Sequence, residues 1–313
     1  NYFFLLLGRF LQGIGASAPR VVSQAMIRDT SSGPIMAKMM SFVMTIFIVI
    51  PVLAPILGQF IIWLSNWELI FIILACYSII ILIWLIFGQH ETLQKKRSFD
   101  LNSIKHGFFE VFKNHITLGF MLVTGVIFGG LVSFLNISQP LFQETFKVGD
   151  KFPFYFAGTA MVIGCSALLN SRLVSRIALE VIVTYALLWV WCWSGLFIFI
   201  SLIFSKLDLV GFMIFSVPAF AMLGFLFSNV NALALSPMGH IAGTASATIG
   251  TSSNILGVLI GACTSYFFSG SPTPMIVVFF VGASFNIFII KKIKKFKLKN
   301  SKSNLGFSSQ QVG

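Results

Sequence analysis

Nine apolar stretches, each long enough to cross a lipid bilayer, dominate this sequence. A membrane helix needs about 20 residues, at a rise of about 1.5 Å each, to cross about 30 Å of hydrocarbon. The stretches are continuous rather than alternating, so they predict helices and not the strands of a barrel. Only 10% of the residues are charged, which is too few to coat a soluble protein of 313 residues. The predicted spans are 2–27, 37–64, 67–87, 116–138, 153–174, 178–204, 209–235, 241–268 and 272–290.

Lysines and arginines are distributed unevenly between the segments that join these spans. One alternating set of segments, which includes the C-terminal tail, carries sixteen of them, and the opposite set carries three. Cytoplasmic loops are enriched in Lys and Arg, so the first set and the C-terminus are expected to be cytoplasmic. Membrane topology therefore explains the net charge of +12, and we expect the lipid bilayer, not nucleic acid, as the partner.

The odd number of spans places residue 1 on the outer side of the membrane. The sequence has neither a visible signal peptide nor an initiator Met, so we expect that an odd number of upstream helices is missing. Three spans precede the longest connector and six follow it. A transporter of two similar six-helix halves would need three more helices at the front. A genuine nine-span protein is the alternative.

The longest connector divides the chain into two predicted bundles. Residues 1–88 would supply three helices of an N-terminal bundle, and residues 116–290 a six-helix C-terminal bundle. We expect the tail at 291–313 to be basic, cytoplasmic and disordered, because it ends in a polar, Ser-rich sequence.

The connector at 89–115 contains a predicted amphipathic helix. Asp100 is placed to cap its N-terminus, and Lys113 lies at its C-terminal end. Four apolar residues share one helical face, which predicts a helix lying on the inner membrane surface. These residues are Leu101, Ile104, Phe108 and Phe112.

The first predicted span, which includes GRFLQGIGASAPRVVSQAMIRD, carries an arginine inside its apolar sequence. Arg9 lies about 10 Å along the helix from its outer end. An arginine at the centre of a membrane helix costs about 2.5–3.5 kcal/mol, so Arg9 is expected to face a polar interior with a partner. Gln12 lies on the same face, and small residues from Gly13 onward allow a neighbouring helix to come close. Snorkelling of Arg9 to the outer interface is the alternative, and for Arg20 snorkelling to the inner surface is favoured.

The residues RFLQGIGASA…AMIRD resemble the fourth-helix motif of major facilitator superfamily drug:proton antiporters, in particular the Bcr/CflA branch of bicyclomycin and chloramphenicol exporters. The resemblance implies a role in proton transfer for Arg9, with Gln12 and Gly13 as further members of the motif. It also implies an all-α polytopic fold, a major facilitator-type bundle with about nine of twelve expected membrane helices. The implied activity is multidrug efflux by proton antiport through alternating access, in a monomer of the bacterial inner membrane.

The next span contains PVLAPILGQF, which resembles the fifth-helix antiporter motif of Gly/Ala-Pro-x-x-Gly. The matching residues are Ala54, Pro55 and Gly58, whereas Gln59 stands where the family usually has a second glycine. Pro51 and Pro55 each remove a backbone donor and are expected to kink the helix. In antiporters this helix is thought to seal the two halves against leakage.

The resemblance continues into the second half of the chain. SALLNSRLVSR resembles the end of the family's eighth helix, and NALALSPMGHIAGTASATIG resembles the connection from its tenth to its eleventh helix. In the second segment a face of small residues is expected to pack against another helix. Its members include Gly243, Ala245 and Gly250.

A substrate cavity is expected between the seventh and tenth helices in the family's order. Amide and aromatic side chains in these spans suit a small amphipathic or drug-like substrate through hydrogen bonds and stacking. The candidates are Phe134, Asn136, Gln139, Phe225 and Asn231, with Asn229 beside them. Alternatively, these amides hold neighbouring helices together.

Acidic residues are absent from the middle of every predicted span. A proton-coupled pump needs a carboxylate that can be protonated and exposed in turn, and in the family it commonly lies in the first helix. We therefore expect the coupling acid in the missing segment, and the truncated chain alone should not pump. A non-transporting remnant and a permease that imports a small metabolite remain as alternatives.

Enzyme activity is not expected. Ser17, in a Gly-x-Ser spacing, has no histidine base within a membrane helix, and the four cysteines form no CxxC pair. We expect no metal and no cofactor.

Overall fold

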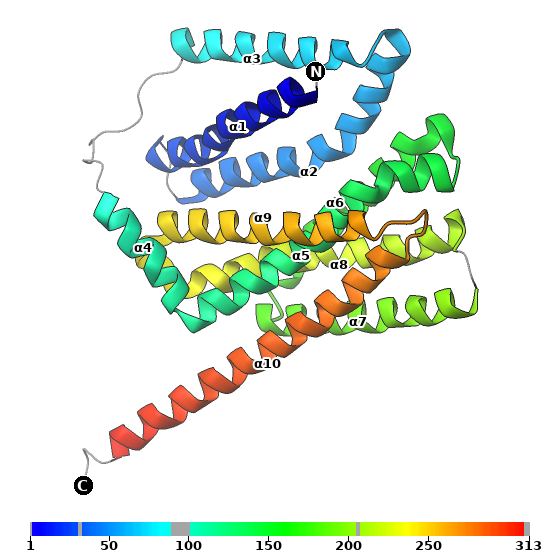
Figure 1. Cartoon of the computed structure of the whole chain (residues 1–313). Coiled ribbons are helices and arrows are strands. Elements are labelled where there is room, and N and C mark those ends of the chain that lie inside the picture. Colours follow the sequence, from blue (N-terminus) through cyan, green and yellow to red (C-terminus); the bar gives the residue numbers. More distant parts are fainter. Residues whose placement is uncertain (1, 31–32, 89–100, 205–206, 310–313) are drawn as a thin grey trace. The chain divides into compact units, whose positions relative to one another are not determined.

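Helices make up the architecture of this chain, as the sequence predicts (Figure 1). The computed structural model describes residues 2–30, 33–88, 101–204 and 207–309, and none of these residues forms a strand. The chain forms two compact units, Asn1–Phe99 and Asp100–Gly313.

The N-terminal unit consists of three helices, α1 (Tyr2–Thr30), α2 (Gly33–Leu64) and α3 (Glu68–Gly88). α2 contacts both α1 and α3, and Figure 1 shows that it bends along its length, as Pro51 and Pro55 predict. α3 has no buried residue, and its bulky side chains, such as Trp84 at 69% exposure, have no protein core to enter. Exposed apolar surface of this kind requires lipid or further helices to cover it.

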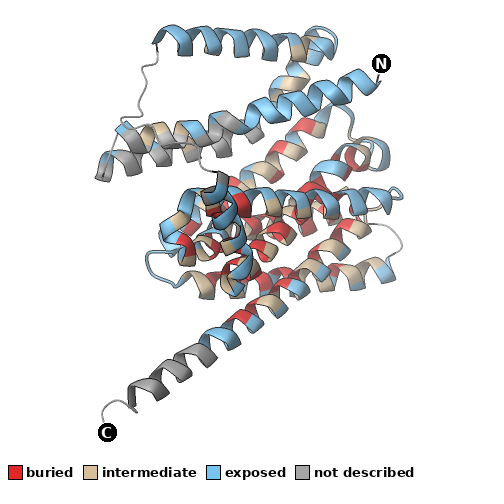
Figure 2. Cartoon of the chain, turned by 60° about the vertical axis from the view of Figure 1, so that its left-hand side comes forward, coloured by how far each residue is buried: buried red, intermediate tan, exposed pale blue. Residues whose placement is uncertain are grey.

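Among the residues whose burial is described, the buried ones lie in the C-terminal unit (Figure 2). It begins with the short α4 (Leu101–Lys113). Longer helices follow: α5 (His115–Pro140), α6 (Phe152–Leu173), α7 (Leu179–Ile203), α8 (Leu209–Leu235), α9 (Ala242–Tyr266) and α10 (Thr273–Ser309). Short helical turns η1 (Leu141–Thr145), η2 (Gly149–Lys151) and η3 (Ser236–Ile241) join some of them.

Side-chain caps define where two of these helices start. The Asn114 side chain accepts hydrogen bonds from the backbone N–H groups of Ile116 and Thr117, at 3.1 and 3.0 Å, and so begins α5. The Asp208 carboxylate accepts from the Gly211 N–H at 2.8 Å at the start of α8. Both caps satisfy backbone donors that the first helical turn leaves free.

α5 occupies the centre of the C-terminal unit and packs against α8, α9 and α10. Its closest partner is α9, because glycines remove side chains from the contact. A Cβ on Gly257 would lie 3.2 Å from the backbone nitrogen of Gly129, and a Cβ on Gly125 would lie 2.8 Å from the Leu256 side chain. Small residues allow the two backbones to come close and make van der Waals contacts. Such packing drives helix association in lipid, where no hydrophobic driving force acts between helices.

The predicted spans correspond to helices of the structure. Seven of them, from 67–87 to 272–290, fall in six described segments that are long and apolar enough to cross a membrane. One segment, Leu209–Tyr266, holds two of these spans, as α8 and α9. The first two predicted spans are helical as α1 and α2.

The connector helix forms as predicted, but it docks on the protein with a different face. In α4, Val111 is fully buried, and a Cβ on Gly107 would lie 3.0 Å from the Thr244 side chain of α9. Phe108 and Phe112, on the predicted apolar face, are 44% and 37% exposed. That face is therefore available for the membrane surface, while the neighbouring face, about 100° around the helix, holds α4 on the bundle. The predicted cap Asp100 lies outside the described residues.

The C-terminal tail differs from the expectation. α10 does not end at residue 290 but continues to Ser309, so residues 291–309 are helical where disorder was expected. Lysine favours helices, and adding residues to an existing helix avoids the cost of nucleation.

Candidate functional site

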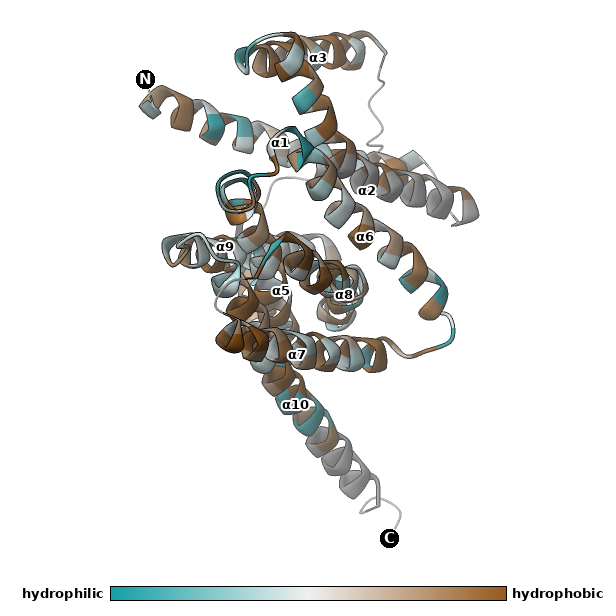
Figure 3. Cartoon of the chain, turned by 90° about the vertical axis from the view of Figure 1, so that its right-hand side faces the viewer, coloured by the Kyte–Doolittle hydropathy of each residue, from teal (hydrophilic) through white to brown (hydrophobic). Residues whose placement is uncertain are grey.

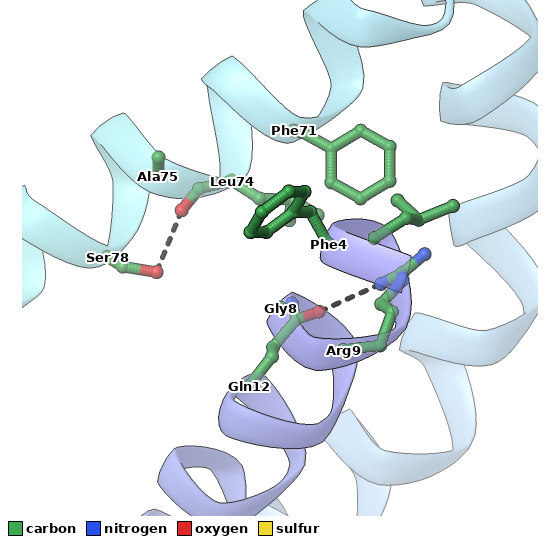
Figure 4. A pocket seen from close by; sticks show the side chains of 9 residues that line it. Phe4, Gly8, Arg9, Gln12, Phe71, Leu74, Ala75 and Ser78 are labelled. Carbon is green, nitrogen blue, oxygen red and sulfur yellow. Dashed lines mark hydrogen bonds between the residues drawn. The ribbon is translucent and has the colours of Figure 1, made fainter. Parts of the chain in front are cut away.

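The arginine of the first helix lies in an open pocket of the N-terminal unit (Figure 4). The pocket has a volume of about 310 Å³ and is formed by α1 and α3. α1 contributes Phe4, Leu5, Gly8, Arg9 and Gln12, and α3 contributes Phe71, Leu74, Ala75 and Ser78.

Two contacts orient the Arg9 guanidinium. Its Nη1 donates a hydrogen bond of 2.8 Å to Oε1 of Gln12, one turn further along α1. Its Cζ lies 4.8 Å from the centre of the Phe71 ring, within the range of a cation–π interaction. The pairing with Gln12 is the one that the spacing of three residues predicts. Arg9 is thus held by an amide and a ring, neither of which neutralises its charge.

Arg9 has donors to spare in this pocket. A guanidinium carries five N–H donors, and the hydrogen bond to Gln12 uses one of them. Among the described residues, no ion pair includes Arg9. The opposite wall of the pocket carries the Ser78 hydroxyl, which donates to the Leu74 carbonyl at 2.8 Å (Figure 4). An anionic group that entered the pocket would therefore meet a fixed positive charge with free donors.

Sequence reasoning missed the α3 side of this pocket. α3 is apolar over almost its whole length, so no periodic polar face indicates that Phe71 contacts Arg9 or that Ser78 lines the same pocket.

The motif glycines of α1 and α2 face open space in the N-terminal unit. An added Cβ on Gly13 or Gly58 would meet no atom of another residue within 4 Å. Ala54 is exposed and Pro55 is half-buried. The close packing predicted for these residues is therefore not made within this unit, and it remains a prediction for contacts with other helices. The Arg20 side chain lies outside the described residues.

Phe134, a predicted cavity residue, belongs to the core of the C-terminal unit. Its ring is only 2% exposed, stacks on Phe156 at 5.5 Å between centroids, and meets Phe220 edge-on at 4.7 Å. A ring enclosed in this way stabilises the bundle and does not line a cavity.

The other cavity candidates are more accessible than Phe134. Asn136 and Gln139 are exposed near the C-terminal end of α5, and on α8 Asn231 is exposed and Phe225 is half-buried. Exposed amides on membrane helices need a polar environment. These four residues stay candidates for the substrate cavity.

The amide of Asn229 holds two helices together, which is the alternative that the sequence left open. Its Nδ2 donates to Asn170 Oδ1 at 2.8 Å, and Asn170 Nδ2 donates to Asn229 Oδ1 at 3.0 Å. Asn170 Nδ2 also lies 3.0 Å from the Ser228 hydroxyl oxygen, which accepts from it. Both amides are buried, at 4% and 2% exposure. The pair therefore locks α6 to α8.

The small-residue face predicted at the start of α9 is only partly used within this unit. Ala245 is fully buried, whereas an added Cβ on Gly243 or Gly250 would meet nothing within 4 Å. The tight packing lies further along α9, where Gly257 and Gly261 face α5.

Comparison with known proteins places the chain in a family. A family model described as Major Facilitator Superfamily matches residues 1–262. The chain is 28% identical over 274 residues to a bicyclomycin resistance protein homolog of Haemophilus influenzae, a match that covers 86% of this chain and 68% of that protein.

Two further relatives match at similar identity. The MFS-type transporter YdgK of Bacillus subtilis is 25% identical over 265 residues, which cover 83% of this chain and 65% of YdgK. The multidrug resistance protein MdtL of Klebsiella pneumoniae is 32% identical over 139 residues, or 44% of this chain and 35% of MdtL. The chain thus spans about two thirds of the length of the first two relatives and about a third of MdtL.

These matches confirm the predicted family, the all-helical membrane fold and the prediction that the protein is a transporter and not an enzyme. The apolar helices make it a multi-pass membrane protein, and its named relatives are bacterial. The chain belongs to the Major Facilitator Superfamily, a family of membrane transporters and not of enzymes.

Proposed function

We propose that the protein exports amphipathic drug-like compounds in exchange for protons, as a Bcr/CflA-type antiporter of the bacterial inner membrane. The observation that carries this proposal is the open pocket in which Arg9 is oriented by Gln12 and Phe71 without a carboxylate partner among the described residues. The relatedness to a bicyclomycin resistance protein homolog and to a multidrug resistance protein supports export as the direction.

Arg9 would couple substrate export to proton entry through its positive charge. A guanidinium does not give up its proton in a protein, so Arg9 is not itself the proton carrier. A nearby positive charge favours the ionised form of a carboxyl group, and moving the two apart allows that group to take up a proton. Alternating access supplies such a movement, because it changes the contacts between two helical halves. We infer that Arg9 controls the protonation of a carboxylate that enters this pocket from another part of the transporter.

The test uses the complete reading frame, expressed in a bacterial strain that lacks its own multidrug exporters. Resistance to bicyclomycin and accumulation of ethidium are measured with and without a protonophore. Export by proton antiport predicts low accumulation that rises when the protonophore collapses the gradient. Arg9→Ala should abolish resistance, because both the charge and the donors are lost, and Arg9→Lys should keep only part of it, because the forked geometry is lost.

Arg176→Ala is the matched control, since Arg176 is exposed in the turn after α6 and belongs to the C-terminal unit, whereas all the residues that line the pocket belong to the N-terminal unit. Equal resistance of cells with wild-type and Arg9→Ala protein would contradict the coupling role. Accumulation above that of cells without the protein would indicate import and overturn the proposal.

A further inference from the structure

The lysine-rich part of α10 has no role in the transport proposal. α10 passes without interruption from an apolar segment into one that contains Lys291, Lys292, Lys294, Lys295 and Lys297, all of them exposed. Figure 3 shows this change from hydrophobic to hydrophilic residues along the helix. The whole of Thr273–Ser309 contains no Asp or Glu, so the helix itself offers no counter-charge.

Two of these lysines fix the rotation of α10 about its axis. Lys297 Nζ forms an ion pair of 2.6 Å with Glu180 of α7, and Lys294 Nζ donates to the Thr184 hydroxyl at 3.2 Å. Ile290 and Ile293, which flank Lys294 on that side, are each 6% exposed in the core. This side of α10 therefore faces the bundle.

The other lysines form a stripe on the opposite side. At about 100° per residue, Lys291, Lys292 and Lys295 fall within an arc of about 100° on the helix surface. Lys292 Nζ lies 5.0 Å from the centre of the Phe288 ring, which is 54% exposed on the same side. The same sequence spacing continues at Lys299 and Lys302. We call Lys291, Lys292 and Lys295 the α10 lysine stripe.

The depth of the stripe indicates its ligand. The apolar part of α10 ends at Ile290, so the stripe begins at the next residue and extends over about 8 Å of helix. This is the level of lipid headgroups at the end of a membrane span. Within the described residues, no ion pair involves the stripe, and the nearest acid along the bundle face, Glu180, is already paired with Lys297.

We propose that the α10 lysine stripe binds the phosphate headgroups of anionic phospholipids. Lysine acts as a point charge and binds phosphate without the planar fork that an arginine needs. A cluster of lysines directly after a membrane helix attracts anionic lipid. The exposed Phe288 ring below Lys292 adds an apolar surface for the upper part of the lipid chains. The inference is independent of the transported substrate and of the direction of transport.

The test measures lipid retained by the purified complete protein, using native mass spectrometry with mixtures of phosphatidylglycerol and phosphatidylcholine. The wild-type protein should retain phosphatidylglycerol preferentially. Each lysine near an anionic surface contributes about fivefold to binding, so Lys291→Gln/Lys295→Gln should weaken retention by about 25-fold.

Lys294→Gln/Lys297→Gln is the matched control, because it removes the same charge from the other side of the same helix. It should keep phosphatidylglycerol and lower the unfolding temperature, since it breaks the contacts with α7. Equal loss of lipid in both double variants would show that net charge alone attracts the lipid, and would overturn the stripe as a site.

Two further measurements on the wild-type protein identify the ligand. Retention of phosphatidylglycerol should fall between about 0.1 M and about 1 M salt, because exposed charges are screened over that range. Retention that does not change with salt would overturn the proposal. So would displacement of the lipid by inorganic phosphate, or tighter binding of a short oligonucleotide than of phosphatidylglycerol vesicles.

Discussion

The reciprocal amide pair between α6 and α8 makes a prediction with a calculable size. Replacing Asn229 by Leu keeps the approximate volume of the side chain but removes both hydrogen bonds to Asn170. Asn170 then keeps one hydrogen bond, to Ser228, and its carbonyl oxygen is left buried without a partner. A membrane-embedded side-chain hydrogen bond is worth about 0.6 kcal/mol on average and up to about 1.7 kcal/mol.

The expected loss from Asn229→Leu is therefore about 2–3 kcal/mol, from two hydrogen bonds and one unsatisfied buried group. Asn170→Leu should cost a similar amount for the same reason. The double variant has no amide left to satisfy, so its loss should be smaller than the sum of the two single losses. We expect a coupling free energy of about 1–2 kcal/mol.

Reversible unfolding of the purified protein by SDS in mixed micelles measures these four free energies. Tryptophan fluorescence serves as the signal, and the slope of the transition shows whether the variants keep the same unfolding behaviour. Additive effects, within about 0.5 kcal/mol, would refute the reasoning, because they would mean that the two amides do not depend on each other.

Two other contacts give predictions of different size. Gly257→Leu should lower the free energy of unfolding by about 1–3 kcal/mol, because the larger side chain forces α9 away from α5. Gly250→Leu is the control, since open space surrounds Gly250. A similar loss of stability in both variants, measured by thermal unfolding, would contradict this explanation. Glu110→Gln removes the charge that faces His240 at 2.6 Å, yet it should cost less than about 1 kcal/mol, because both side chains are substantially exposed. A larger shift in the same assay would show that this pair, not the buried Val111, holds α4 on the bundle.

Hydropathy predicts most of the fold because the bilayer leaves few alternatives. Backbone polar groups in hydrocarbon must be satisfied within the segment, so a long apolar run has to be a helix. The spans at 67–87 and 178–204 accordingly match α3 and α7 closely. The pairing of Arg9 with Gln12 was predictable for a similar reason, because a helix brings residues three apart onto one face.

Contacts between helices could not be predicted in the same way. A membrane helix is apolar on the side that faces protein and on the side that faces lipid, so its sequence does not show how it is rotated. Asn136 and Asn229 carry the same amide, yet one is exposed and the other is locked to Asn170. Gly250 and Gly257 likewise lie seven residues apart on α9, but only Gly257 meets α5.

The two units differ in how their polar groups are satisfied, and this difference bears on function. In the C-terminal unit, polar side chains bond across helices: the Ser133 and Thr264 hydroxyls share a hydrogen bond of 2.7 Å, and Ser253 donates to the Met121 carbonyl at 3.1 Å. In the N-terminal unit, the charge of Arg9 lies open and meets only an amide and a ring among the described residues.

An uncompensated charge is expensive in a membrane, whereas internally bonded hydroxyls and amides are not. A protein that retains an uncompensated charge therefore requires a partner for that charge during transport. The bonded hydroxyls and amides already have partners. Under the proposed coupling role, we expect the bonds named above in the C-terminal unit to persist during transport, because their groups already have partners. In the same role, the exchange of partners falls to Arg9. A carboxylate placed on α3 one turn from Phe71, as in Ala75→Asp, would give Arg9 a permanent partner, and we expect it to stop transport without unfolding the protein.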